Sequence, residues 1–452
     1  MLCIAFVIRL SVAVSDIPLL GDAKTRYDPI AQNLLQGNGF SRDTAPPYRA
    51  DNFDQPAYPL MLASTYAVTD RSRRSVVLFQ LFLEVIILLT VWGIARALKL
   101  PRGAQRLAVG IGLVCPFLAK YAGLILSEVL ATLFICLACY AFLRAVQEPA
   151  SNKYVWWVLA GVMSGISLLV RADTLIAVGL MSVVAIVLPR SLTATSRLKQ
   201  IGLLAIALVL TLAPWTARNY LRFERFIPLG TLSNQSRLPY VRWMNTWFDD
   251  PADLKTFWWD ALTDGPPPPF PADKIPDDDQ RIRAANALIE ARAQKTLAGD
   301  SAQQFQDLAD QAARERPLNT FVVVPLRRVI KTWLYPQVNR VPTLMGTRLP
   351  FFSIQGLWLV LSVFTFIGVV NALRLKQYSV LLLVAVIFGR VVLPFISSLG
   401  ADPRLLVESL PAMYVLSAMG AFAGYEFIPA RSSRKVHQKF NSRRLGSGGA
   451  SG

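Results

Sequence analysis

The sequence predicts an all-α, polytopic membrane protein. Of its 452 residues, 53% are hydrophobic, which exceeds the roughly 45–50% apolar content of soluble domains. Apolar stretches close to the ~20 residues that a membrane-spanning helix needs recur along the chain. Lysine and arginine gather in alternate connections between these stretches, a distribution typical of cytoplasmic loops in membrane proteins.

Ten apolar stretches are candidate membrane spans. They cover residues 1–18, 74–98, 104–120, 122–145, 154–170, 172–189, 199–217, 351–373, 378–397 and 404–428. An even number of spans places both termini on the same side of the membrane. The first stretch is short and contains Arg9, as a signal peptide could. Because no convincing cleavage site follows residues 12–15, we predict an uncleaved first helix.

The basic residues predict the sidedness of the loops. Cations occupy every second connection and the C-terminal tail: Arg96, Lys99, Arg102, Arg106, Arg144, Lys153, Arg190, Arg197, Lys199, Arg374, Lys376 and residues 431–445. The bias of such residues toward the cytoplasm predicts cytoplasmic termini. It places the loops at about 19–73 and 218–350 on the outer face of a bacterial cytoplasmic (inner) membrane. The formal charge of +18 therefore reflects topology, and no aromatic-interleaved basic module suggests nucleic-acid binding.

Cysteine and histidine are too few and too scattered to predict a zinc site. The four cysteines, Cys3, Cys115, Cys136 and Cys139, all lie in predicted spans, where small apolar core residues are expected. The only histidine, His437, lies in the basic tail, far from any second ligand pair. A general base on the outer face must therefore be Asp, Glu, Lys or Tyr.

The spans and loops divide the chain into five parts. Residues 1–235 form an N-terminal transmembrane module whose first outer loop, 19–73, includes an interfacial helix near residues 56–68. Residues 236–350 form a mostly helical outer segment with a second interfacial helix, and residues 351–430 hold the last spans. A basic cytoplasmic tail at 431–445 and a Gly/Ser-rich expression linker at 446–452 follow.

Aromatic residues are concentrated early in the outer segment. They are Trp243, Trp247, Phe248, Phe257, Trp258 and Trp259. We favour a belt at the level of the lipid headgroups, with a sugar-binding platform as the alternative. Residues 277–315, rich in Ala, Gln, Glu and Arg, predict one or two soluble helices.

A series of motifs in a shared order resembles a known superfamily. The motifs are Arg9, Asp22, Tyr27, AQNLLQGNGF at 31–40, QPAYP at 55–59, SE at 127–128, LVRAD at 169–173, PWTARNY at 214–220, Arg404 and Pro411. Together they resemble the GT-C glycosyltransferases that use polyprenyl-phosphate sugars, the group that includes protein O-mannosyltransferases and lipid A aminoarabinose transferases. The resemblance implies a GT-C fold and transfer of a sugar from a polyprenyl-phosphate donor to a glycan, lipid or protein acceptor.

The resemblance also implies a site in the first outer loop. Asp22 matches the superfamily's acidic residue there and is the expected general base, although it could instead cap the following helix. Asp28 is the second candidate, with Pro29 after it favouring a cap. Tyr27, Gln55 and Tyr58 lie in matching motifs and are expected to bind substrate.

Charged residues at the outer ends of spans complete the predicted site. Glu128 is a third catalytic candidate, with Lys120 as its partner and Tyr121 beside it, unless the ion pair merely braces two helices. Arg171, Arg218 and Arg404 are expected to grip the lipid phosphate, although any one of them could snorkel to the interface. Asn219, next to Arg218, is assigned to the same substrate-binding group.

Neither a cofactor nor a metal is expected. Asp22 is followed by Ala23 where many relatives have a second acidic residue, which weakens the case for a divalent cation. Two other functions remain open. A ligase of lipid-linked glycans could share this layout, and a transporter or flippase could share the intramembrane charges, although no internal repeat supports the latter.

Overall fold

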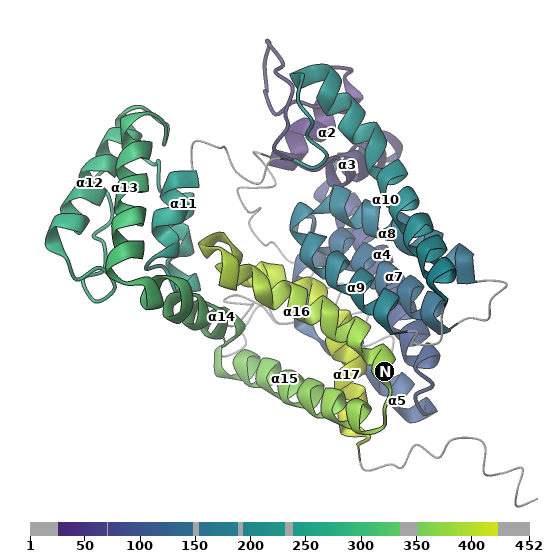
Figure 1. The fold of residues 1–452 in the computed structure, drawn as a ribbon. Helices are drawn as coiled ribbons and strands as arrows, with labels where there is room; N and C mark the ends of the chain where they lie inside the picture. The colour runs from purple at the N-terminus through teal and green to yellow at the C-terminus, as the bar shows by residue number, and fades with distance from the viewer. Residues whose placement is uncertain are drawn as a thin grey trace, which may run out of the picture.

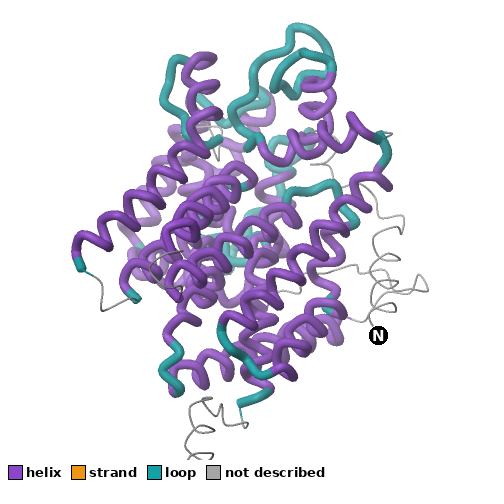
Figure 2. The backbone as a smooth tube through the Cα atoms, turned by 90° about the vertical axis from the view of Figure 1, so that its right-hand side faces the viewer, coloured by secondary structure: helices purple, strands orange, loops and turns teal. Residues whose placement is uncertain are grey.

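The computed structural model describes residues 26–69, 71–147, 153–188, 193–230, 238–334 and 351–423. Within these ranges every regular element is a helix (Figures 1 and 2), which confirms the predicted all-α class. The predicted first span, Asp22, the basic tail and the Gly/Ser-rich linker lie outside the described residues.

Seven helices form the N-terminal bundle. They are α4 (Arg73–Ala97), α5 (Arg102–Val114), α6 (Pro116–Ala122), α7 (Glu128–Gln147), α8 (Lys153–Val170), α9 (Leu175–Val187) and α10 (Ala194–Phe223). Among the described residues, five helices are long and apolar enough to cross a membrane: Arg74–Ala97, Glu128–Gln147, Ala194–Phe223, Gln355–Arg374 and Tyr378–Ile396. Shorter apolar helices cover Tyr154–Val170 and Ala172–Val187. The protein is therefore polytopic, as predicted.

Several predicted spans are not single α-helices in the structure, and those at 104–120 and 404–428 depart most from the prediction. The span at 104–120 is broken at Cys115, whose extended backbone separates α5 from α6, because the following Pro116 disfavours a helical conformation there. The span at 404–428 begins with a 3-10 helix, η9 (Pro403–Ser409), and only then continues as α17 (Leu410–Ala421). Both interruptions fall at the ends of apolar stretches, where hydropathy does not specify the type of helix.

The C-terminal helices α15 (Phe351–Arg374), α16 (Leu381–Ile396) and α17 complete the bundle (Figure 1). Helices α15 and α17 make the most extensive helix pair of the structure. Their backbones approach closely at Gly368 and Gly420, where an added Cβ would overlap carbonyl oxygens of the facing helix. Such small residues allow close crossings between membrane helices. Helix α16 packs on α9, which ties the C-terminal part to the N-terminal bundle.

The first loop contains two helices, α2 (Asp28–Leu35) and α3 (Ala57–Val68), which pack on each other beside α4 and α8. Helix α3 coincides with the predicted helix at 56–68 and buries Tyr58 and Leu62. Its position at a membrane interface remains a prediction.

Residues 238–334 form a separate helical layer, which we call the α11–α14 segment. It comprises α11 (Leu238–Asn245), α12 (Asp278–Ala293), α13 (Asp300–Glu315) and α14 (Val324–Leu334), seen at the left of Figure 1. Its helices confirm the soluble helices predicted at 277–315. Helix α14 packs on α16 and so attaches the segment to the bundle.

The aromatic cluster forms the core of this segment. Trp243, Trp247, Phe248 and Phe257 are at most 5% exposed and pack in one hydrophobic cluster with Phe305 of α13. The expected headgroup belt is therefore wrong for these four residues. Their burial follows from packing against a helix that begins some forty residues later, which their own stretch of sequence does not reveal.

Candidate active site

A cavity of about 110 Å³ opens where α7 begins and α8 ends. Four stretches that are distant in sequence line it: Arg26, Tyr27, Phe53, Asp54 and Gln55 of the first loop; Leu126, Ser127 and Glu128; Val170, Arg171, Ala172 and Asp173; and Arg404. Five of the predicted site residues therefore meet at one place: Tyr27, Gln55, Glu128, Arg171 and Arg404. The lining is dominated by charged and polar groups in an otherwise apolar bundle.

Glu128 is the first residue of α7, and its side chain is 2% exposed. A helix N-terminus carries a partial positive charge that favours a carboxylate. Its Oε1 lies 3.3 Å from Nη1 of Arg171, whereas its buried Oε2 accepts no hydrogen bond from any described residue. A carboxylate that lines the cavity therefore has one oxygen without a hydrogen-bond donor among the described residues. The described ion pair of Glu128 is with Arg171; Lys120 was its expected partner.

Arg171 is held by three carboxylates. It donates two hydrogen bonds to Asp173, the shorter being 2.8 Å from Nη2 to Oδ2. Its Nε lies 3.3 Å from Oε1 of Glu408 in η9, and its Nη1 faces Glu128. The extended backbone of Arg171, between α8 and the short 3-10 helix Ala172–Thr174, turns the side chain toward these partners. The guanidinium group is thus fixed at the wall of the cavity.

A second, deeper arginine extends this network. The side chain of Arg390, in α16, is fully buried and lies 3.4 Å from Asp173 and 3.2 Å from Glu408, measured from the guanidinium nitrogens to the carboxylate oxygens. It also donates to the carbonyl of Leu405 at 2.6 Å. The contacts to Glu408 are close in distance but not aligned as hydrogen bonds. Glu128, Arg171, Asp173, Arg390 and Glu408 therefore form one buried charge cluster, with two cations for three carboxylates.

The first loop supplies another buried carboxylate, Asp54. Its side chain is fully buried and forms ion pairs with Arg26 and, at 3.0 Å, with Arg42. Both guanidinium groups lie over the ring of Phe53, 4.9 and 4.6 Å from its centre. Burial raises the pKa of Asp54, and the two arginines oppose that rise. This arrangement places the positive charge of Arg26 at the cavity.

The aromatic residues of the first loop form the wall behind these charges. Tyr27 packs edge-on against Tyr58 with ring centres 4.9 Å apart, and its hydroxyl lies 3.5 Å from the hydroxyl of Ser127. Tyr58 donates to Gln80 and does not line the cavity. Gln55 donates to the carbonyl of Gly230 at 3.4 Å, whereas its buried Oε1 accepts no hydrogen bond.

Arg404 lines the cavity from η9. It pairs with Asp402 at 2.6 Å, and its guanidinium carbon lies 5.8 Å from the ring centre of Trp259. Because Trp259 belongs to the α11–α14 segment, this arginine connects the cavity to that segment.

Besides Tyr58, five predicted residues lie outside the cavity lining. Asp28 accepts hydrogen bonds from Gln32, Tyr66 and Arg71. Arg218 donates to the carbonyls of Asp51 and Phe40, and Asn219 donates to Ile227, so both hold loops in place. Lys120 and Tyr121 lie together in α6, with the ammonium 5.5 Å from the ring centre.

Sequence reasoning missed four residues of the site: Arg26, Asp54, Arg390 and Glu408. A signal existed for the last two, because each is an ionisable residue inside a predicted span, and such residues are rare and commonly functional. Among the described residues, no group of three or more His, Cys, Asp or Glu side chains could hold a metal ion.

A comparison with known families matches the part of the chain that builds this cavity. The model of the family described as dolichyl-phosphate-mannose-protein mannosyltransferase matches residues 54–216, more than a third of the chain. Those residues include Asp54, Gln55, Glu128, Arg171 and Asp173. The fold is that of a polytopic, all-α membrane protein. Within residues 54–216 the chain is similar to the mannosyltransferase family named above.

Solved structures show a more distant similarity. Two crystal structures of ArnT from Cupriavidus metallidurans, one in the apo state and one bound to undecaprenyl phosphate, match with a TM-score of 0.42 and 14% sequence identity. Each match covers 93% of this chain and 76% of the other chain. Similarity at this level does not support a correspondence between individual residues. No curated protein sequence matches this chain.

Proposed function

We propose that this protein transfers a sugar from a polyprenyl-phosphate carrier to an acceptor at the outer face of a bacterial cytoplasmic membrane. The observation that carries the proposal is a cavity lined by three guanidinium groups, those of Arg26, Arg171 and Arg404, together with the Glu128 carboxylate. Guanidinium groups suit a phosphate, which they bind through paired hydrogen bonds. A carboxylate suits an acceptor hydroxyl that must lose its proton.

The reaction would proceed as a substitution at the anomeric carbon. The acceptor oxygen forms a bond to that carbon while the bond to the phosphate oxygen breaks, and the polyprenyl phosphate leaves with the electron pair. Cations that face the phosphate stabilise the charge that develops on it. A carboxylate takes the proton of the acceptor hydroxyl.

Two residues are proposed for the base. Asp22 is favoured by the resemblance of the first loop, and Glu128 is favoured by geometry, because its Oε2 is buried at the cavity without a hydrogen bond. Asp28 is less suited, since Tyr66, Arg71 and Gln32 already occupy its oxygens. No step requires a metal ion, so we expect transfer to continue in the presence of EDTA.

The basic residues support an outward-facing site. Arg96 and Arg102 flank the turn between α4 and α5, and Arg144 lies in the last turn of α7. The cavity lies at the opposite end of α7, where Glu128 begins that helix. If the basic end is cytoplasmic, the cavity faces outward, and donor and acceptor meet there.

The test is transfer from a panel of radiolabelled polyprenyl-phosphate sugars in proteoliposomes. We expect Asp22→Asn or Glu128→Gln to lower the rate by roughly 10²-fold or more, the usual contribution of a general base. Arg404→Ala should weaken transfer by removing a phosphate-facing cation, and Asp28→Asn serves as the comparison. Each variant is checked for monodispersity and thermal stability.

The outcomes separate the alternatives. Loss of transfer in only one of Asp22→Asn and Glu128→Gln identifies the base. Normal transfer by both variants would contradict the proposed chemistry. If the wild type uses no polyprenyl-phosphate sugar, the ligase or transporter function replaces the proposal.

A further inference from the structure

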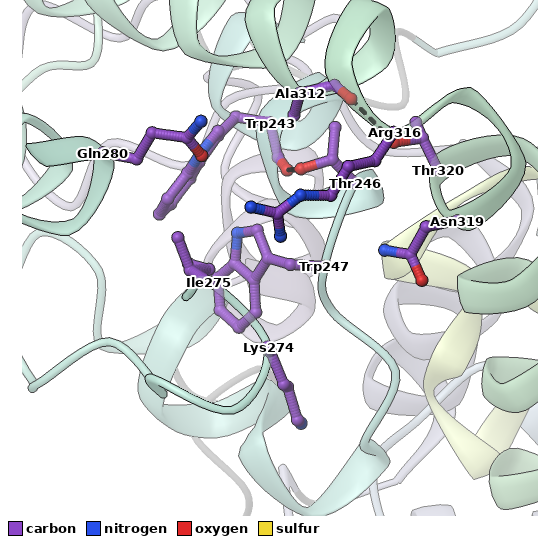
Figure 3. Close-up of a pocket in the computed structure, with 10 residues that line it drawn as sticks. All are labelled: Trp243, Thr246, Trp247, Lys274, Ile275, Gln280, Ala312, Arg316, Asn319 and Thr320. Carbon is purple, nitrogen blue, oxygen red and sulfur yellow. Dashed lines mark hydrogen bonds between the residues drawn. The ribbon is translucent and has the colours of Figure 1, made fainter. Parts of the chain in front are cut away.

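Two adjoining cavities lie within the α11–α14 segment, apart from the proposed transfer cavity. One is a small pocket of about 20 Å³ (Figure 3), and the other is a cleft of about 510 Å³. Both are lined by Trp247, Lys274, Arg316 and Asn319. Neither shares a lining residue with the cavity at Glu128. The larger volume lies within the range of small-ligand pockets.

The indole of Trp247 presents a hydrogen-bond donor that the structure leaves unused. The side chain is 3% exposed, and its Nε1 is buried without any hydrogen-bond partner. A buried donor without an acceptor costs free energy, and such groups are uncommon in folded proteins. Because Trp247 lines both cavities, a ligand in the cleft could supply the missing acceptor.

Arg316 brings further donors to the same place. It follows the last residue of α13, and its side chain makes no hydrogen bond or ion pair with any described residue. Figure 3 shows its guanidinium group over the indole of Trp247, with the indole nitrogen on the side that faces it. Asn319 adds an amide that points toward the same space. Donors from three side chains thus line the same space.

The charges around the cleft favour an anion. Four cations line it, Lys274, Arg316, Arg327 and Lys331, against Asp249 and Asp273. Asp249 pairs with Lys274 at 2.9 Å and with Lys331 at 3.0 Å, and the same lysines also pair with Asp253 at 3.6 Å and Asp250 at 3.4 Å. The lysines are therefore neutralised by these carboxylates, and the positive charge available to a ligand is that of the two arginines, opposed in the lining by Asp273.

We infer that this cleft binds a saccharide that carries a carboxylate or phosphate group, outside the transfer cavity. The anionic group would accept hydrogen bonds from Arg316 and from Nε1 of Trp247. The neutral amide of Asn319 can both donate to and accept from sugar hydroxyls. The buried indole face leaves no exposed aromatic surface for stacking nucleobases, which argues against a nucleic acid. The assignment of this saccharide as the acceptor chain rests on the proposed function.

The test measures binding without catalysis. The full-length protein in nanodiscs of neutral lipid is titrated with three soluble probes: an oligogalacturonate, a phosphorylated malto-oligosaccharide and unmodified maltohexaose. We expect saturable binding of the two anionic probes and at least tenfold weaker binding of the neutral one. Arg316→Ala and Trp247→Phe should each weaken anionic binding by about tenfold, in line with the loss of a hydrogen bond to a charged group.

Arg314→Ala is the matched control. Arg314 lies in the last turn of the same helix and carries the same charge, but it does not line either cavity. The Arg314→Ala variant should therefore bind the anionic probes as the wild type does. Equal binding of neutral and anionic probes, or unchanged binding in both Arg316→Ala and Trp247→Phe, would overturn the inference. Equal loss in Arg314→Ala would also overturn it, because a general charge effect would then suffice.

Two further arms identify the source of the saccharide and separate the two proposals. In the first arm, the lipid of the nanodiscs that hold the protein is varied. Binding of an anionic glycolipid in the nanodisc, but not of phosphatidylglycerol, would indicate a lipid-anchored saccharide. Binding to phosphatidylglycerol alone would contradict saccharide recognition. Sugar transfer is measured on the same variants. If the wild type binds the anionic probes as expected but transfers no sugar, the inference stands and the proposed function is refuted. If the wild type transfers sugar but Arg316→Ala and Trp247→Phe bind the probes as the wild type does, the proposed function stands and the inference is refuted.

Discussion

Arg328 connects the α11–α14 segment to the membrane bundle, and its replacement by methionine should loosen that connection. The side chain is fully buried in α14. It donates to three carbonyl oxygens: Phe248 at 2.8 Å, Asn245 at 3.0 Å and Pro394 of α16 at 3.2 Å. Burial lowers the pKa of Arg328 to about 10, so the group stays charged at neutral pH. These hydrogen bonds are therefore charge-assisted.

The expected loss of stability in Arg328→Met follows from the three carbonyl groups that lose their hydrogen-bond donor. Methionine fills much of the same space but donates nothing, so three carbonyls are left unsatisfied at about 1–3 kcal/mol each. Removing a buried charge returns part of this cost, because its desolvation penalty disappears. We therefore expect a net loss of about 3 kcal/mol, less than the sum of the three.

The assay combines thermal unfolding in detergent with limited proteolysis. Arg328→Met should lower the Tm and expose sites in residues 238–334 to protease before sites in the bundle. Arg327→Met, at the neighbouring exposed position, controls for charge and should behave like the wild type. An unchanged Tm and an unchanged cleavage pattern in Arg328→Met would refute the reasoning.

Three further perturbations test other parts of the structure. Gly368→Val should disrupt the crossing of α15 and α17 and cost about 1–3 kcal/mol or more, whereas Gly356→Val, with open space around it, should leave the Tm unchanged. Burial opposes ionisation of Asp249, but Lys274 and Lys331 outweigh it and hold the pKa of this carboxyl below its usual range. Its stabilising effect is complete above the unfolded-state pKa of about 4 and is lost as the pH falls through the lower folded-state pKa, so the Tm advantage of the wild type over Asp249→Asn should shrink as the pH falls below about 4. Arg390→Met should destabilise the bundle by about 3–5 kcal/mol because a buried carboxylate loses its partner, and the double variant with Glu408→Met should recover much of that loss in the same Tm assay.

Hydropathy predicted the helices well because a membrane span needs length and apolar composition, which are local properties. It could not predict the break at Cys115 or the 3-10 start of the last helix, since both depend on a few backbone angles at the end of a stretch. Sequence alone also could not predict whether the aromatic residues at 243–259 lie at the membrane interface or in a protein core. A tryptophan suits a membrane interface and a protein core equally well, and only the contact of Trp243 with Phe305 decides between them.

The individual residues of the site were partly predictable from the sequence, whereas the contacts between them were not. Glu128 and Arg171 could be recognised singly, because each is a charged residue at the end of an apolar stretch. Their pairing could not, since it depends on how α7 and α8 turn toward each other. Arg218 has the same sequence signature as Arg171, but it binds the carbonyls of Asp51 and Phe40. Which of two similar arginines meets a carboxylate is decided by tertiary structure alone.

The buried charge cluster explains why Arg171 can serve the cavity at all. A single buried guanidinium would cost several kcal/mol in desolvation and would turn toward solvent. Here Asp173 and Glu408 pair with the guanidinium group of Arg171. Arg390 pairs with the same two carboxylates and offsets part of their negative charge. Arg390 contacts nothing in the cavity lining except through Asp173, so its effect on substrate is indirect. The cluster thus fixes the direction of Arg171, and under the proposed function an anion that enters the cavity would meet a cation that need not reorganise.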